Sequence, residues 1–297
     1  HRVYAEAEAL YDRVLADVTR VGREAAAALL QPQAGAVTAC NALGWARTAL
    51  VPLPAGATVP GATQTIAGTV YAEAALPACG WAAVGTAVEG TALAASTAGL
   101  ENECLRLILN DRGEIVSLFD KAAGRELAAA PLNSLRLYKD TPEAYDAWDL
   151  DSTYKSLPVA LDAPAQLEVL GAGPLAAVVR VTRRLHDSVL TQEIWLRRGS
   201  RTVEFRTVVD WRERHKLLKV NFPTVLHAHE AVHEIQFGHL RRPNHASRPF
   251  DADRYEVANQ KWTALVEEGR GAAVLNDCKY GVNVEGGSIN LTLLRSP

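Results

Sequence analysis

The 297-residue sequence has no excess of either charge and no long hydrophobic run. Its 31 basic and 34 acidic residues give a net charge of −3 and are mixed along the chain. No basic stripe or basic amphipathic face therefore points to nucleic acid or to a membrane surface. No apolar run approaches the roughly 18 residues that span a bilayer, and no signal-peptide pattern is visible. Neither nucleic acid nor a membrane is expected as a partner.

Cysteine is scarce, and so are the motifs of common catalytic sites. The sequence contains no CxxC pair, GxSxG elbow, glycine-rich phosphate loop or HExxH pair, so hydrolysis by a serine or cysteine triad is not expected. Widely spaced cysteines in a chain of this length favour buried free thiols in a reducing compartment. We therefore expect a cytoplasmic protein with four unpaired cysteines, Cys40, Cys79, Cys104 and Cys278.

Apolar residues at spacings of three and four predict one long amphipathic helix at the start of the chain. No second strongly amphipathic helix follows, so we expect the packing partners of its stripe upstream of His1. Residues 1–31 are therefore interpreted as the tail of a truncated helical bundle. The stripe comprises Val3, Ala7, Leu10, Val14, Val18, Val21, Ala25 and Leu29.

After Pro32 the sequence changes to short strand-like segments separated by glycine, proline and threonine. Residues 34–98 are therefore predicted to form a small linking antiparallel β-domain, with a joint at Gly90 to Gly99. The expected strands lie near Val37 to Cys40, Thr48 to Leu53, Thr63 to Ala75 and Trp81 to Val88.

From residue 99 onward, alternation of apolar and polar residues dominates. It is clearest over Ala177 to Leu185, Leu190 to Leu196 and Thr202 to Val209. Strands of this number and spacing predict a large β-sandwich over residues 99–297. The chain halts directly after a hydrophobic strand, so we expect this sandwich to be truncated at its end.

The closing stretch combines an ordinary β-hairpin with unusual residue choices. Gly281 to Val284 alternates, Gly286 and Gly287 form a turn, and a returning strand follows. Asn-Asp-Cys-Lys-Tyr-Gly before the hairpin and Leu-Leu-Arg-Ser-Pro after it resemble the C-terminal β-domain of the α-mannosidases of glycoside hydrolase family 38. The resemblance is strong over residues 100–297 and looser over 1–98. Other matching segments are Leu100-Glu101-Asn102-Glu103, Asp146-Ala147-Trp148-Asp149-Leu150-Asp151, Ile235-Gln236-Phe237-Gly238 and Arg242-Pro243-Asn244-His245.

This resemblance implies a mainly β fold with a mutarotase-like supersandwich, in a zinc-dependent retaining α-mannosidase that acts on oligosaccharides or glycans. The family's nucleophile, acid/base carboxylate and zinc ligands would all lie upstream of His1. We therefore expect no catalytic residue, metal ligand or cofactor in this fragment and no activity from it alone. Zinc is expected in the missing catalytic domain. The implied partners are that upstream domain of the same chain and a mannose-containing glycan.

The fold alone leaves a second function open. The chain could be a stand-alone carbohydrate-binding or scaffold β-sandwich module, with Trp148 and Trp262 as platforms for sugar rings.

His227, His229 and His233 form the sharpest metal-like pattern, because imidazole is a common zinc ligand. On an extended strand, however, even the second and third side chains would lie roughly 13 Å apart. The family resemblance assigns no ligand to them. We therefore expect a surface or rim strand with exposed histidines.

Trp148, Asp149 and Asp151 resemble a glycosidase site, because two carboxylates with an aromatic platform could share one face. Retaining glycosidases hold their carboxyl groups about 5 to 5.5 Å apart. Carboxylates in such a loop also commonly accept backbone hydrogen bonds, which is the alternative reading. The resemblance implies that these residues border the missing active site and that neither Asp is catalytic.

Arg242, His245 and Arg295 are candidates for an interface with the catalytic domain. An arginine fork binds carboxylates in a bidentate manner and is favoured at interfaces. We therefore expect these residues to meet a partner domain rather than to recognise the substrate directly.

Overall fold

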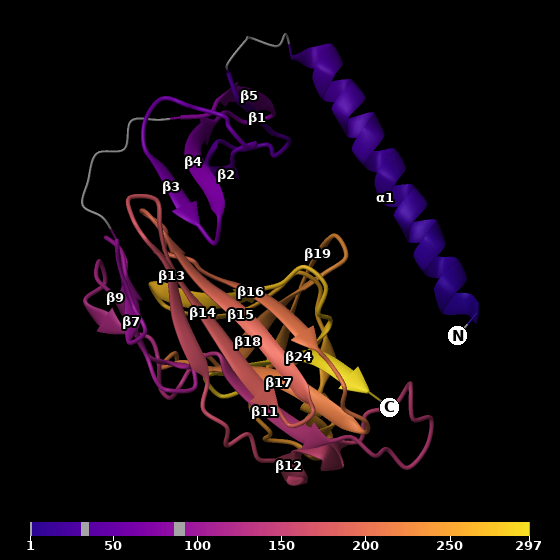
Figure 1. Ribbon diagram of the computed structural model, residues 1–297. Coiled ribbons are helices and arrows are strands. Elements are labelled where there is room, and N and C mark those ends of the chain that lie inside the picture. The colour runs from indigo at the N-terminus through magenta and orange to yellow at the C-terminus, as the bar shows by residue number, and fades with distance from the viewer. Residues whose placement is uncertain (1, 31–35, 86–92, 297) are drawn as a thin grey trace. The chain divides into compact units, whose positions relative to one another are not determined.

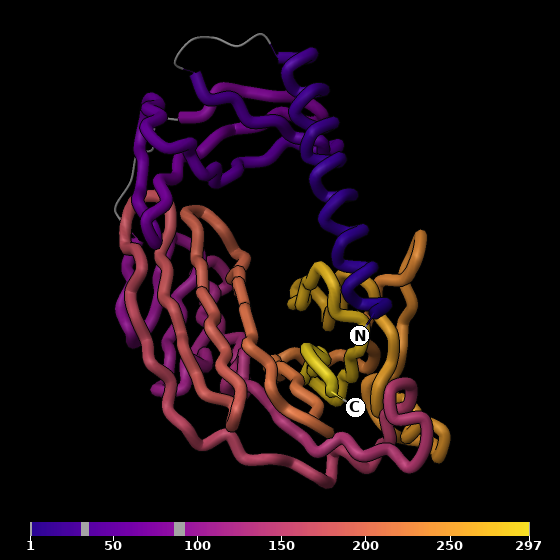
Figure 2. Tube along the Cα trace, turned by 45° about the vertical axis from the view of Figure 1, so that its right-hand side comes forward, coloured from indigo at the N-terminus to yellow at the C-terminus, as the bar shows by residue number. Residues whose placement is uncertain are grey.

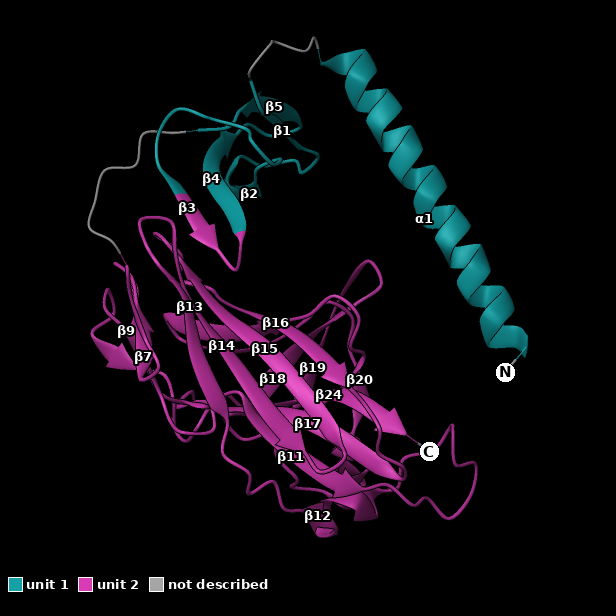
Figure 3. Cartoon of the chain, in the orientation of Figure 1, with its two compact units in different colours: residues 1–63, 69–88 teal, residues 64–68, 89–297 magenta. Residues whose placement is uncertain are grey.

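The chain divides into two compact units, which Figure 3 shows in different colours. The computed structural model describes residues 2–30, 36–85 and 93–296. Unit 1 comprises residues 1–63 and 69–88, and unit 2 comprises residues 64–68 and 89–297.

Antiparallel strands make up most of both the small and the large β regions, so the prediction of a mainly β chain is confirmed. The finer division at residues 1–31, 34–98 and 99–297 stays a prediction. The expected joint at Gly90 to Gly99 lies partly outside the described residues, and its described part begins a strand, Ala94–Ser96.

The predicted N-terminal helix is present as α1 (Arg2–Leu29, Figure 1), and none of its described residues is buried. Its stripe residues Leu10, Val14 and Val18 are all about half exposed or more. Ion pairs such as Arg20 with Glu24, one helical turn apart, add little, because exposed pairs contribute at most about 0.5 kcal/mol. No described helix is both long and apolar enough to cross a membrane.

Unit 1 contains the small antiparallel β structure that the sequence predicts. Its core is formed by Leu53, Ala72, Ala74, Leu76 and Val84. Two sheets are present, with strand orders β1-β5 and β2-β4-β3. The strands are β1 (Thr38–Asn41), β2 (Arg47–Pro52), β3 (Thr63–Ile66, of which residues 64–66 are counted with unit 2), β4 (Thr69–Leu76) and β5 (Gly80–Ala83).

One half of unit 2 consists of a five-stranded sheet packed on a four-stranded sheet of long strands (Figure 1). Leu105 and Leu107 alternate with exposed residues, as expected of a half-buried strand, and they pack in one core with Val179 and Ile194. The five-stranded sheet contains β6 (Ala94–Ser96), β7 (Gly99–Glu101), β8 (Leu105–Leu109), β9 (Ile115–Asp120) and β10 (Arg125–Glu126). The four-stranded sheet contains β13 (Gln166–Ala172), β14 (Ala176–Leu185), β15 (Ser188–Arg197) and β16 (Val203–Asp210).

The other half of unit 2 packs a six-stranded sheet on a four-stranded one. Val220 and Leu291 of the larger sheet share a core with Ala231 and Leu265 of the smaller. The larger sheet has the order β12-β11-β17-β24-β23-β20, with β11 (Ser134–Lys139), β12 (Pro158–Val159), β17 (Lys216–Pro223), β20 (Val257–Ala258), β23 (Gly281–Glu285) and β24 (Ser288–Ser296). The smaller has the order β19-β18-β21-β22, with β18 (Glu230–Ile235), β19 (Gly238–Pro243), β21 (Trp262–Glu267) and β22 (Arg270–Leu275).

The predicted closing hairpin is confirmed as β23 paired with β24. Gly286 has a φ of 55°, which suits glycine in a tight turn. A Cβ atom on Gly287 would lie 2.5 Å from the carbonyl oxygen of Thr224, so the close approach of this backbone requires glycine. The left-handed turn at Gly286 and the close approach of Thr224 to Gly287 together explain why two glycines occupy these positions.

The expectation of three exposed histidines is wrong for His233, which is 1% exposed. His233 lies in β18, and its Nδ1 is 3.0 Å from Oγ1 of Thr263 on β21. Burial, reinforced by the charge of Arg242, lowers the pKa of His233 to about 4. His227 and His229 precede the strand and are exposed. Among the described residues, no group of three His, Cys, Asp or Glu side chains could hold a metal ion.

The four cysteines are free thiols, but the expectation that they are buried is wrong. Cys40, Cys79 and Cys278 are exposed, and Cys104 is half-buried. Cys79 has a φ of 45°, so it occupies a turn rather than a core strand.

Candidate functional site

The aromatic and acidic residues singled out from the sequence lie in one loop, residues 141–151, between β11 and a short 3-10 helix, η1 (Ser152–Ser156). Within it, the amides of Trp148 and Asp149 both donate to the carbonyl oxygen of Tyr145. The side chains of Trp148 and Tyr145 are 89% and 77% exposed. The loop is thus folded on its own backbone, while its rings face solvent.

Arg295, near the end of β24, holds the backbone of this loop in place. Its Nε donates to Oδ2 of Asp140 at 2.5 Å, and its Nη2 donates to Oδ1 at 3.2 Å. The same Nη2 donates to the carbonyl oxygens of Asp146, at 3.0 Å, and of Asp149. Arg295 is therefore paired with a carboxylate of its own domain, and the bidentate pair holds the loop that carries Trp148. A role of Arg295 at an interface with the catalytic domain stays a prediction.

The two acidic candidates have different environments. Asp151 is half-buried, and its Oδ2 accepts a hydrogen bond from the amide of Glu143 at 3.0 Å. Asp149 is exposed. Because the segment is a loop, the spacing of an i, i+2 strand pair does not apply. Asp151 closes the loop across its base, in line with the backbone-accepting alternative, and Asp149 is presented outward.

Arg242 and His245 do not share these contacts. Nη1 of Arg242 donates to the carbonyl oxygen of Ala258 at 3.2 Å, and burial lowers the pKa of Arg242. Nδ1 of His245 lies 2.8 Å from Oγ of Ser247. The structure therefore joins Trp148, Asp149, Asp151 and Arg295 through one loop. It ties Arg242 to β20 and His245 to the turn that follows β19.

Two residues of this site were missed from the sequence, Asp140 and Tyr145. Asp140 directly follows a strand, and nothing in its neighbourhood signals an arginine 155 residues away. Tyr145 has a φ of 53°, in the left-handed region that favours glycine or asparagine. An exposed tyrosine in that conformation is unusual, and backbone strain of this kind is frequent at functional sites.

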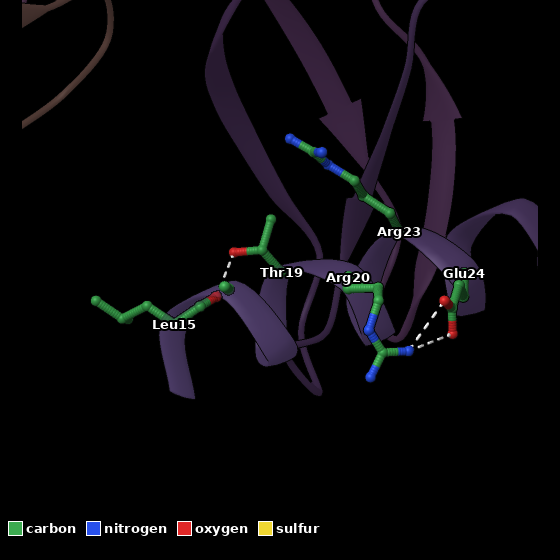
Figure 4. A pocket seen from close by; sticks show the side chains of 6 residues that line it. Leu15, Thr19, Arg20, Arg23 and Glu24 are labelled. Atoms are coloured by element: carbon green, nitrogen blue, oxygen red, sulfur yellow. Dashed lines mark hydrogen bonds and ion pairs between the residues drawn. The ribbon is translucent and has the colours of Figure 1, made fainter. Parts of the chain in front are cut away.

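Two hollows on the described part of the surface are poorer candidates for a site than this loop. One of about 490 Å³ is lined by α1 alone, where Oγ1 of Thr19 donates to Leu15 and Arg20 pairs with Glu24 (Figure 4). Another, of about 470 Å³, lies on the strands β14 to β16, and its charged residues Arg180 and Glu193 bind each other at 2.9 Å. Neither presents a set of groups suited to acid/base or nucleophilic chemistry.

Comparison with known proteins identifies the family. The sequence profile described as "Glycosyl hydrolases family 38 C-terminal domain" matches residues 100–297. The chain belongs to glycoside hydrolase family 38. Among relatives of this family 38 chain, human "Alpha-mannosidase 2C1" is 40% identical over 202 residues, which cover 67% of the chain and 19% of that protein. "Alpha-mannosidase G" of Dictyostelium discoideum is 36% identical over 209 residues, again 67% of the chain and 19% of the relative. The family 38 chain thus spans about a fifth of these relatives.

Solved structures agree on the fold of the family 38 chain. An α-mannosidase from Enterococcus faecalis V583 superposes with a TM-score of 0.61 at 16% identity, covering 84% of this chain and 32% of that one. A second structure from Enterococcus faecalis, described as a protein in glycosyl hydrolase family 38, also has a TM-score of 0.61, at 14% identity. The match covers 90% of this chain and 36% of the Enterococcus faecalis chain.

Proposed function

We propose that this chain is the C-terminal part of a zinc-dependent, retaining α-mannosidase that hydrolyses α-mannosidic bonds in oligosaccharides or glycans. The activity is supported by its relatives, which are named as α-mannosidases. The observation that carries the role of the chain is the loop at residues 141–151. Its backbone is held by Arg295, whereas its rings and Asp149 face outward. A loop built in this way suits the border of a sugar-binding cleft.

The chemistry of this loop is that of binding rather than bond cleavage. The exposed face of Trp148 offers an apolar surface for the C–H groups of a sugar ring, and the carboxylate of Asp149 can accept hydrogen bonds from hydroxyl groups. In the proposal these residues orient a mannose-containing glycan, and the rest of the domain buttresses the catalytic domain of the same protein.

The described residues do not fit a zinc site. The nearest pattern fails because His233 is buried against Thr263, while His227 and His229 are exposed outside its strand. The proposal therefore assigns zinc, together with the nucleophile and acid/base carboxylate, to a catalytic domain outside these residues. Exposed free thiols fit the cytoplasm, where such groups stay reduced.

Activity measurements on the longest native chain that contains these residues would test this proposal. We expect hydrolysis of an aryl α-mannoside, lost with a chelator and restored by zinc. The 297-residue chain alone is expected to be inactive. Activity that survives complete metal removal would contradict zinc dependence, and turnover by the highly purified fragment would contradict the placement of the catalytic groups.

The exposure of Trp148 also favours a second function, that of a stand-alone carbohydrate-binding module. In that case the fragment would bind a mannose oligosaccharide in calorimetry, and the longest native chain would show no mannosidase activity. Trp262, the other suggested platform, is half-buried in β21 and is less suited to stack on a sugar.

A further inference from the structure

The loop at residues 141–151 is held from a second side by Tyr255. This residue ends a 3-10 helix, η2 (Pro249–Tyr255), which Figure 2 shows beside the loop although the two are far apart in sequence. The phenol of Tyr255 donates to the carbonyl oxygen of Leu150 at 2.6 Å. Together with Arg295, it binds three backbone carbonyls within five consecutive residues of the loop.

Tyr255 is in turn anchored by its neighbour Glu256, which is fixed to the six-stranded sheet. Nζ of Lys219, itself 2% exposed, lies 2.5 Å from Oε2 of Glu256. Oγ1 of Thr292 donates to Oε1 of the same carboxylate at 2.6 Å. A Cβ atom on Gly281 would lie 2.9 Å from Oε1, so the glycine leaves the space that this carboxylate occupies.

The same carboxylate also binds the short helix that follows the loop. The phenol of Tyr154, in η1, donates to Oε2 of Glu256 at 3.4 Å. Burial lowers the pKa of Lys219 and raises that of Tyr154. Burial, and then the charges of Asp151 and Asp149, raise the pKa of Tyr255, which keeps its phenol protonated as a donor. Each of these tyrosines therefore remains a hydrogen-bond donor at neutral pH.

We propose that Tyr255 and Glu256 are positioning residues that hold the backbone of the loop so that Trp148 is presented to the glycan in one orientation. The inference rests on the proposed function. The network binds the backbone of the loop at Leu150 and its flank at Tyr154, and it leaves the ring of Trp148 exposed. If the network served stability alone, its loss would not change how the exposed ring of Trp148 binds a ligand.

Hydrogen exchange on the 297-residue chain tests the positioning without any enzyme assay. Tyr255→Phe removes one hydroxyl group, and we expect the amides of Trp148 and Asp149 to exchange roughly five- to tenfold faster, as for the loss of one net hydrogen bond. The matched control is Tyr280→Phe, a half-exposed tyrosine of the same unit, which should leave these amides unchanged. Unchanged exchange in Tyr255→Phe would overturn the proposal.

Kinetics of the longest native chain give the second test. We expect Tyr255→Phe to lower kcat/KM about tenfold, chiefly through KM, and to have little further effect when Trp148 is already alanine, because it acts through that ring. Additive effects would refute the positioning role. Glu256→Asp should fall between wild type and Glu256→Ala in both assays. A native chain without mannosidase activity would contradict the proposed function only, since hydrogen exchange would still decide the positioning.

Discussion

Arg295 and Asp140, 155 residues apart in the sequence, form a bidentate ion pair in which the carboxylate is 1% exposed. The pair joins β24 to the residue that follows β11, although β17 lies between these strands in the sheet. One guanidinium therefore binds the end of the sheet and the loop that carries Trp148. Stability and loop geometry depend on the same side chain.

Replacing Arg295 by glutamine should destabilise unit 2 by about 3 kcal/mol, because it leaves the buried carboxylate of Asp140 without its cation. Arg295→Lys should cost less, since it keeps the charge but loses the fork. Urea unfolding followed by tryptophan fluorescence would measure both. Arg212→Lys is the control, because its pair with Asp210 is exposed, and it should have no measurable effect. Equal stability of Arg295→Gln and wild type would refute this account.

Trp148→Ala should leave the stability of the 297-residue chain almost unchanged, because its side chain is 89% exposed. In the longest native chain it should lower kcat/KM by roughly 10- to 100-fold, or about 1.4 to 2.7 kcal/mol. Trp45→Ala, at another exposed tryptophan, is the matched control and should keep normal kinetics. Normal kinetics in Trp148→Ala would show that the loop does not border the cleft.

His233 predicts a pH dependence of stability. Its pKa is about 4 in the folded chain and about 6.5 in the unfolded chain, so the unfolded state binds more protons between these values. Stability is therefore full above pH 6.5 and is lost as the pH falls towards 4, by up to about 3 kcal/mol. Urea unfolding at several pH values should show a smaller loss in His233→Gln. The exposed His227→Gln should keep the wild-type slope.

Phe237 occupies the turn between β18 and β19 with a φ of 61° and a fully exposed ring. A left-handed conformation is costly for a side chain other than glycine or asparagine. Phe237→Gly should therefore stabilise the chain, by about 1 kcal/mol. Phe237→Ala retains the strained conformation and should show no such gain. Thermal unfolding of the two variants would separate backbone strain from loss of the ring, and a less stable Phe237→Gly would contradict the prediction.

The strands were predictable from the sequence where alternation is long and uninterrupted. The segments Ala177 to Leu185 and Leu190 to Leu196 correspond closely to β14 and β15 because each has one face in a core. Burial of single residues was harder to predict. His227 and His229 precede the start of β18, so the pattern that suggested one continuous strand assigned His233 to the wrong face.

The candidate site was predictable as a set of residue types but not as an arrangement. Asp-Ala-Trp-Asp-Leu-Asp attracts attention by its composition alone. Its geometry depends on Arg295 and Tyr255, which reach it from distant parts of the chain. Periodicity describes neighbours within an element, and it carries no information about which loop a distant side chain will bind.

The exposed thiols make the chain ready for distance spectroscopy. Cys278 lies in unit 2, whereas Cys40 and Cys79 lie in unit 1, and all three are accessible to a thiol-reactive spin label. Replacing Cys79 and the half-buried Cys104 by serine would leave one thiol for labelling in each unit. The dipolar coupling between labels on Cys40 and Cys278 would then report the separation of the two units in solution, and its change on adding a glycan would be a direct readout of domain movement.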